Sequence, residues 1–447
     1  MRIPVALLAS LAATLLVAGA CSGNSPQPPL LGAGGWSWSP AVAGDHPLPV
    51  LWWGNTTPTP LPLLDGGDCS ASGSVQGLVA EASKPLAVGI SVTCAGGVPS
   101  MLPVAWPGRT VQALPLPAGA TQGTALAVAS RLGPERIAIL HRYVGGATGT
   151  TSPLPTFWRD GVLAAWDRTA LLPPDHDAGM VTSIAVTDQY VLAAGVVHRT
   201  GSSPPAYSGI VWLFDLTFAV STWSFLPLPT EPGEASFGPW VSMVIEGDTV
   251  WSAAAVQGAA GAPKPVVWKD DAPGLWFGLE FGAAPWASPT GLSMVELVPY
   301  SSGWVRPTST GGPPQPAIWA GSILDILPAA DPSNPIGAGE AIAIHLEGAY
   351  VSGESLAGDP SSPSRRLAVP AIWSNGARTD LGTLSAPGAG PAISGPLFGW
   401  WRLPGTPGTS PPDWPYPGGT GEVLGSLPVS AAGSGVARTV VAVPPSP

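Results

Sequence analysis

The sequence predicts an all-β protein built from many short strands, on three observations. Gly and Pro account for 58 and 56 of its 447 residues, 45% of residues are hydrophobic against 10% charged, and its 20 Trp recur at regular spacing. Pro this frequent argues against helices, since a Pro inside a helix costs about 3 kcal/mol. A disordered chain would carry more charge and fewer core-forming residues. Short strands joined by Pro and Gly turns satisfy both constraints.

A repeat of about 53 residues runs through the chain. Its clearest mark is a Trp that ends an apolar, often Pro-led segment, and successive copies lie 51 to 56 residues apart. We expect these periodic Trp to fill the space between neighbouring repeats, since a Trp buries roughly 150–250 Å². The set comprises Trp53, Trp106, Trp158, Trp212, Trp268, Trp319 and Trp373.

Each repeat contains four predicted strands. Two apolar segments around a turn precede the Trp-ending segment, and a short strand ending near Leu-Pro follows it. Asp160-Gly161 and Asn375-Gly376 stand two residues after their Trp, which is the strongest short-range hairpin signal. Four antiparallel strands per period of this length indicate a β-propeller.

The repeats predict about eight blades, with seven as the close alternative. The eighth unit would contain Trp400, Trp401 and Trp414, whose spacing fits poorly, and the first unit lacks room for its first strand before Trp36. The apolar C-terminal segment 436–443 can supply that strand. Such a closure would remove the exposed sheet edges of the ring. We therefore expect one propeller domain over residues 36–447.

The N-terminus predicts export. Residues 4–20 are apolar and uncharged, and Ala18-Gly19-Ala20 precede Cys21. This arrangement resembles the lipobox of bacterial lipoproteins, which implies cleavage of a signal peptide at residues 1–20 and acylation of Cys21, palmitate being the chain to test for. Acyl chains at about 0.8 kcal/mol per buried CH₂ would anchor the protein. An ordinary secretory signal with a chance Cys is the alternative.

Residues 21–35 form a Pro- and Gly-rich tether in this interpretation. Export places the remaining cysteines, Cys69 and Cys94, in a compartment that permits disulfides. A bridge between them would contribute roughly 3 kcal/mol, and two free thiols are the alternative.

The unit around Trp373 resembles a known family. Trp373-Ser-Asn-Gly-Ala-Arg-Thr-Asp-Leu-Gly-Thr-Leu384 is similar to the HAF-type repeat of bacterial extracellular proteins, which carries Trp-x-Asn-Gly followed by Asp-Leu-Gly-x-Leu. Tyr350-Val-Ser-Gly353 looks like the Tyr-Val-Ala-Gly strand of related Trp-Asn-Gly repeat lipoproteins. The resemblance implies a secreted propeller and supplies no catalytic residues.

No motif for catalysis stands out. The sequence lacks a Gly-x-Ser-x-Gly elbow, a His-Glu-x-x-His helix and a phosphate-binding loop. Asp175-His176-Asp177 offers weak candidate metal ligands, but neighbouring residues of a strand point to opposite faces, and a solvated loop is the plainer interpretation. We expect no cofactor and assign no catalytic residue.

The sequence favours a monomeric lipoprotein that is anchored to the membrane outside the cytoplasm, in the cell envelope, and serves as a binding or scaffold module. An envelope protein or a glycan is the expected partner. The net charge of −11 argues against nucleic acid, since an acidic surface repels phosphates. The alternative is a propeller enzyme that acts on polysaccharide or peptide at the mouth of the channel.

Overall fold

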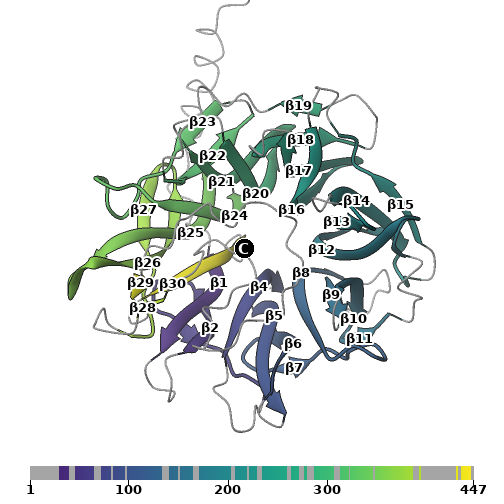
Figure 1. Ribbon diagram of the computed structural model, residues 1–447, viewed down its shortest axis with the longest axis horizontal. Helices are drawn as coiled ribbons and strands as arrows, with labels where there is room; N and C mark the ends of the chain where they lie inside the picture. Colours follow the sequence, from purple (N-terminus) through teal and green to yellow (C-terminus); the bar gives the residue numbers. More distant parts are fainter. Residues whose placement is uncertain are drawn as a thin grey trace, which may run out of the picture.

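In the computed structural model, seven antiparallel sheets surround a central axis as the blades of a β-propeller (Figure 1). The structure describes residues 30–39, 46–64, 72–81, 84–95, 98–132, 140–149, 152–164, 171–202, 207–218, 221–228, 234–258, 263–270, 276–278, 286–306, 313–321, 323–345, 348–385, 392–393, 429–430 and 434–443. The prediction of an all-β propeller is confirmed. Seven is the lower of the two blade numbers that the sequence allowed.

Each blade has four main strands, which follow one another from the channel outward. Blade 1 comprises β30 (Gly435–Val443), β1 (Leu30–Ser39), β2 (His46–Trp53) and β3 (Thr59–Pro60). Blade 2 comprises β4 (Ser72–Glu81), β5 (Lys84–Ala95), β6 (Val98–Pro107) and β7 (Gln112–Ala113). Blade 3 comprises β8 (Gln122–Leu132), β9 (Leu140–Gly149), β10 (Leu154–Arg159) and β11 (Val162–Leu163). Blade 4 comprises β12 (His176–Val186), β13 (Tyr190–Arg199), β14 (Tyr207–Asp215) and β15 (Ser221–Phe225).

Blades 5 to 7 follow the same order. Blade 5 comprises β16 (Glu234–Glu246), β17 (Thr249–Gly258), β18 (Pro263–Lys269) and β19 (Trp276–Gly278). Blade 6 comprises β20 (Trp286–Val295), β21 (Val298–Arg306), β22 (Gln315–Ala320) and β23 (Ile323–Ile326). Blade 7 comprises β24 (Gly337–His345), β25 (Gly348–Asp359), β26 (Ser362–Ser374) and β27 (Ala377–Asp380). Two further short strands, β28 (Ala392–Ile393) and β29 (Val429–Ser430), extend the sheet beyond β26.

The C-terminal strand closes the ring. β30 pairs antiparallel with β1 and becomes the innermost strand of blade 1, as the sequence predicted (Figure 1). Val436 and Ala437 of β30 are fully buried. The segment therefore completes the first repeat instead of beginning another. Residues 394–428, from which the eighth unit was counted, lie outside the described part of the chain.

Six of the periodic Trp bond their blade to the one before it, and the seventh, Trp319 of blade 6, is fully buried. The indole N–H of each of the six donates to a backbone carbonyl in the segment that follows the outermost strand of the preceding blade. The observed donor and acceptor pairs, at 2.7–2.9 Å, are Trp106 to Pro62, Trp158 to Pro115, Trp212 to Leu171, Trp268 to Pro227, Trp373 to Pro328 and Trp52 to Gly382. The last pair joins blade 1 to blade 7 and so completes the circle.

The structure corrects one member of the periodic set. Trp52, and not Trp53, is fully buried and makes the bond between blades. Trp53 is only partly buried and lies over Gly32. The register follows from the turn: Gly54, two residues after Trp52, has a φ of +72°, and the equivalent Gly108 and Gly321 are also positive.

The Asp-Gly and Asn-Gly hairpins form as predicted. Asp160 and Gly161 have φ values of +53° and +80°, and Asn375 and Gly376 have +49° and +78°. Positive φ at both central residues is the type I′ requirement. These residues therefore act as turn formers, and Asp160 in addition accepts the backbone N–H of Arg142 at 2.8 Å.

The two cysteine predictions stay untested by the fold. Cys21 and Cys69 lie outside the described residues, and only the backbone of Cys94 is described, in β5. Among the described residues, no helix combines the length and the apolar composition that a bilayer crossing requires.

Candidate functional site

The innermost strand of every blade carries a β-bulge at a corresponding position. At each bulge the pairing with the neighbouring strand skips at least one residue, which is then free to leave the sheet plane. The skipped residues are Gln76, Leu126, Thr182, Gly238–Trp240, Thr290, Glu340 and Arg438. Seven bulges at one level therefore form a ring around the axis.

These bulges line a central cavity of about 180 Å³. All seven innermost strands contribute to its wall. Leu126, Ile184 and Met243 are apolar members, and the partly buried Trp240 adds an aromatic ring. Gln76, Glu340 and Arg438 supply polar and charged groups from blades 2, 7 and 1. The cavity thus has an apolar part and a hydrogen-bonding part.

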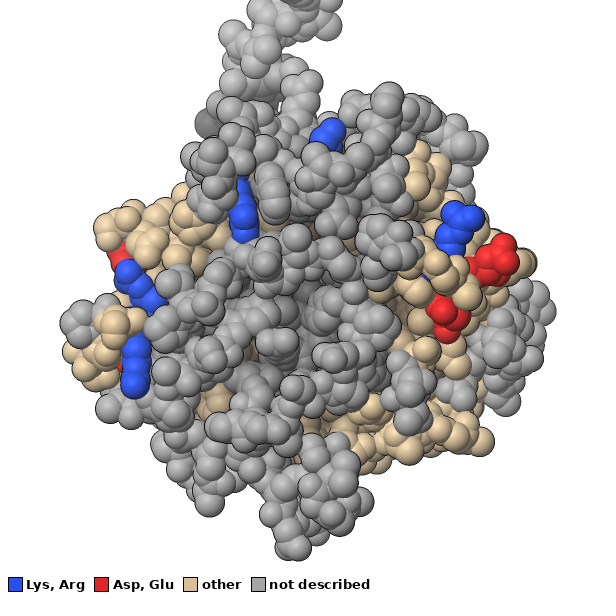
Figure 2. Space-filling view, in the orientation of Figure 1, with Lys and Arg blue, Asp and Glu red and all other residues tan. Residues whose placement is uncertain are grey.

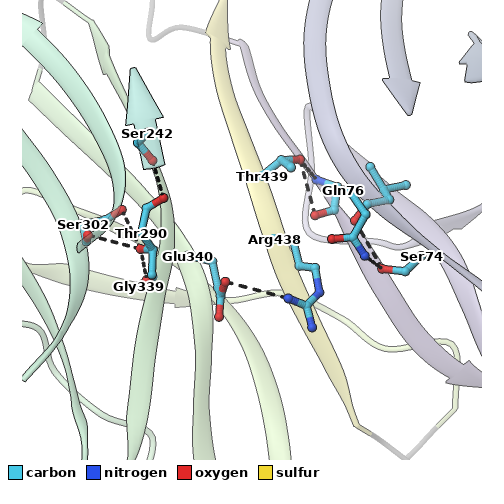
Figure 3. A network of polar contacts seen from close by, with 11 residues as sticks. Ser74, Gln76, Ser242, Thr290, Ser302, Gly339, Glu340, Arg438 and Thr439 are labelled. Carbon is cyan, nitrogen blue, oxygen red and sulfur yellow. Dashed lines mark hydrogen bonds and ion pairs between the residues drawn. The ribbon is translucent and has the colours of Figure 1, made fainter. Parts of the chain in front are cut away.

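Two bulge threonines hold neighbouring blades together. Thr182 of blade 4 donates to the carbonyl of Val241 in blade 5 at 2.7 Å and accepts the N–H of the same residue at 3.2 Å. Thr290 of blade 6 donates to the carbonyl of Gly339 in blade 7 at 2.6 Å. Ser242 donates to the carbonyl of Thr290 at 2.7 Å (Figure 3). Because these hydroxyls are engaged, they fix the cavity wall.

Glu340 and Arg438 face each other across the boundary between blades 7 and 1 (Figure 3). The closest guanidinium nitrogen and carboxylate oxygen lie 3.9 Å apart, which is too long for a hydrogen bond. The two side chains are 4% and 6% exposed, so this charge pair is almost wholly removed from bulk water. Oε2 of Glu340 has no hydrogen-bond donor among the described residues, so it can accept one from a ligand.

A second carboxyl lies in the same boundary. Glu354 on β25 is fully buried, and neither of its carboxyl oxygens has a hydrogen-bond partner among the described residues. The hydroxyl of Ser352, also fully buried on the same face of β25, lacks one as well in that part of the chain. Strand β25 packs against β30. Buried polar atoms are nearly always paired in folded proteins, so this group is a candidate for binding a further partner.

Burial shifts the acidity of both carboxyls. Desolvation raises the pKa of Glu340 to about 7, and Arg438 partly opposes that rise. Desolvation also holds the pKa of Glu354 well above its ordinary value, with a further rise from the Glu340 charge and an opposing effect of Arg438. The site therefore holds at least one carboxyl proton near neutral pH.

The weak metal candidates do not come together. Asp175 takes a φ of +65° in the turn before β12, while His176 Nδ1 lies 3.0 Å from the carbonyl of Pro174 and its ring lies against Phe225. Asp177 instead contacts His198 Nδ1 at 2.6 Å. No group of three His, Cys, Asp or Glu suited to a metal occurs among the described residues.

The charged side chains that are visible on the face of the molecule in Figure 2 lie away from its centre.

Sequence reasoning did not find the channel residues, although a signal existed. Glu340 interrupts a strand of small and apolar residues, as does Arg438. In a chain with 10% charged residues, a charge inside a predicted core strand is informative, since such residues are rarely fully buried.

Comparison with known proteins assigns the chain to no family. No protein-family model and no curated protein matches it. A triple arginine-to-alanine mutant of AofleA from Arthrobotrys oligospora matches with a TM-score of 0.39 and 13% identity, over 68% of this chain and 85% of that chain. The GH32 β-fructofuranosidase BmSUC1 of Bombyx mori matches with a TM-score of 0.31 and 10% identity, over 67% and 76%.

A third solved structure is similar to the same degree. The sucrose-6-phosphate hydrolase of Lactobacillus gasseri gives a TM-score of 0.32 and 12% identity, over 66% of this chain and 74% of that chain. Similarity at this level carries no information on ligand or reaction, so the functional argument depends on the channel itself.

Proposed function

We propose that the protein is a binding propeller that holds a sugar unit of a glycan in its central channel. The observation that carries this proposal is the two-sided cavity of about 180 Å³ on the axis, with an aromatic and aliphatic wall beside buried hydrogen-bonding groups. Ligand sites in proteins combine these two kinds of surface.

A sugar fits both parts of this cavity. Its C–H face can pack on Trp240, Leu126 and Met243, while its hydroxyls, which donate and accept, can meet Glu340 and Arg438. Trp240 is held in place, since its indole N–H donates to the Ser242 hydroxyl at 3.1 Å. A rigid aromatic wall loses little conformational entropy on binding.

Binding to a glycan array, followed by calorimetry of each hit, tests the proposal. Trp240→Ala should weaken binding at least tenfold, because it removes the aromatic wall. Trp223→Ala is the matched control, since Trp223 lies on the outermost strand β15 and is 37% exposed. Equal loss in both variants, or glycan binding that neither alters, would contradict binding in the channel.

A second candidate function is hydrolysis of a glycan or peptide in the same cavity. Glu340 favours it, because a carboxyl that lines a cavity and has a pKa of about 7 is suited to general acid catalysis near neutral pH. Incubation of each array hit with the protein, followed by mass spectrometry, should then reveal products. Glu340→Gln should abolish turnover while a bound hit remains detectable; turnover that survives this change would exclude the role.

We further propose that the propeller is tethered to a bacterial membrane through acylated Cys21 and works as a monomer in the cell envelope. The support is the sequence pattern around Cys21 alone. Labelling of cells with a palmitate analogue should mark the wild-type protein and not Cys21→Ala. Equal labelling of the two would refute the anchor.

A further inference from the structure

The boundary between blades 7 and 1 contains an unequal set of buried charges. Glu340 comes from β24, Glu354 from β25 and Arg438 from β30, and each residue is at most 7% exposed. Two carboxyls therefore face one guanidinium. Since a buried charge without a counter-ion is costly, the described part of the site is short of one positive charge whenever both carboxyls are ionised.

The carboxyl oxygens are also short of hydrogen-bond donors in the described part of the site. Both oxygens of Glu354 and Oε2 of Glu340 lack a hydrogen-bond donor among the described residues. Glu340 lines the channel cavity, so its carboxyl is within reach of a ligand there. A cationic donor is the group that would satisfy both the charge and the empty acceptor capacity.

We propose that the channel ligand carries a primary ammonium group, as an amino sugar does, which pairs with Glu340 while Arg438 neutralises Glu354. This inference rests on the proposed sugar-binding function and names the class of sugar. A neutral sugar would supply no cation to replace the bound proton, and an acidic sugar would add a further negative charge.

Binding then exchanges a proton for the ligand cation. In the free site, two carboxyls, one guanidinium and one bound proton are neutral together. In the complex, two carboxylates balance the guanidinium and the ammonium, and one proton leaves to solvent. The affinity should consequently rise with pH as long as the ligand amine stays protonated.

The other strands around the cavity do not disturb this charge count. Glu340 and Arg438 are the charged residues among those that line the cavity, and Glu354 interacts with both of them. The remaining polar wall residues, such as Gln76 of β4, Ser242 of β16 and Thr290 of β20, do not titrate.

Calorimetry of the full-length chain in detergent with glucosamine, N-acetylglucosamine and glucose tests the inference. The three sugars share a ring and differ in the group at one carbon. At pH 7 we expect glucosamine to bind at least tenfold more tightly than glucose. Titrations at pH 6 in two buffers of different ionisation enthalpy should show release of at least one proton for glucosamine and none for glucose.

Two variants assign the effect to the buried carboxyls. Glu354→Gln and Glu340→Gln should each reduce glucosamine affinity to that of glucose and remove the proton release. Circular dichroism and thermal unfolding establish that each variant is folded. Glu81→Gln is the control: this residue makes an ion pair with Arg142 at 2.7 Å between blades 2 and 3 and should change neither quantity.

The outcomes separate this inference from the proposed function. Equal binding of the three sugars, or glucosamine binding without proton release, would overturn the inference and leave sugar binding intact. Binding of ethanolamine with proton release, without binding of any sugar, would support the ammonium pairing and overturn the sugar-binding function. Failure of all four compounds to bind would overturn both.

Discussion

The boundary between blades 4 and 5 and the boundary between blades 7 and 1 use the same bulge position in opposite ways. In the first, Thr182 bonds to both backbone groups of Val241 and closes the gap between two strands. In the second, Glu340 lies 3.9 Å from Arg438, and its Oε2 has no hydrogen-bond donor among the described residues. The bulge turns its residue toward the axis, and the side chain placed there decides whether the position holds two blades together or, as we propose, contacts a ligand.

The largest effect should come from removal of the closing strand. Truncation after residue 433 deletes β30 and exposes the edge of β1 together with the apolar surface that Val436 and Ala437 cover. We expect loss of cooperative thermal unfolding and aggregation in size-exclusion chromatography. Truncation after Val443 is the control and should behave as the full chain. Cooperative unfolding of the shorter protein would show that closure does not depend on β30.

The charged boundary should make stability depend on pH. The folded state raises the pKa of Glu340 from 4.5 to about 7, so it holds a proton that the unfolded chain releases between these values. The free energy of unfolding should therefore fall as pH rises from 4.5 to 7, by roughly 3 kcal/mol for this group. Urea unfolding across this range should show the decline, and the variant Glu340→Gln/Glu354→Gln should show less of it. An equal slope in the variant would assign the pH dependence to other groups.

A smaller loss should distinguish the two Trp at the end of β2. Trp52→Phe removes the bond to the Gly382 carbonyl and leaves unfilled space in a fully buried site, with an expected loss of about 2–3 kcal/mol. Trp53→Phe should cost less than about 1 kcal/mol, because that side chain is only partly buried. Denaturant unfolding measures both, and the reverse order would restore Trp53 to the periodic set.

The smallest effect should come from the threonine that joins blades 4 and 5. Thr182→Val keeps the shape but leaves both backbone groups of Val241 without the hydroxyl, at a cost of about 1–2 kcal/mol. Thr110→Val is the control, since that exposed hydroxyl bonds only within its own turn. Thermal unfolding should place the first variant below the second. Identical midpoints would mean that the hydroxyl does not stabilise this boundary.

Much of the fold could be predicted because its signals are local. Asp160-Gly161 and Asn375-Gly376 form their turns through backbone preferences that two residues express alone. The Leu-Pro segments also have a repeated role: the N–H of Leu114 bonds to the carbonyl of Pro103, and the carbonyl of Pro115 accepts the indole of Trp158. Trp52 and Trp53 offer the same sequence pattern, and only the turn at Gly54 distinguishes them.

The candidate site could not be predicted in the same way. Glu340 lies in blade 7, whereas Arg438 lies on the C-terminal strand β30. Their contact therefore forms only once β30 has joined blade 1. The bulges that turn seven side chains toward the axis also depend on pairing between strands. A repeat pattern shows positions that are alike, whereas this site consists of the positions at which the repeats differ.

By itself, the sequence determined the β class, the four-stranded repeat, the hairpin turns and the strand that closes the ring, because turn preferences and apolar spacing act over a few residues. The tertiary structure decided the number of blades and which of Trp52 and Trp53 is buried. It also brought two carboxyls and one guanidinium together at the boundary between blades 7 and 1. These depend on closure, since only a completed ring brings distant strands together and excludes water from the charges between them.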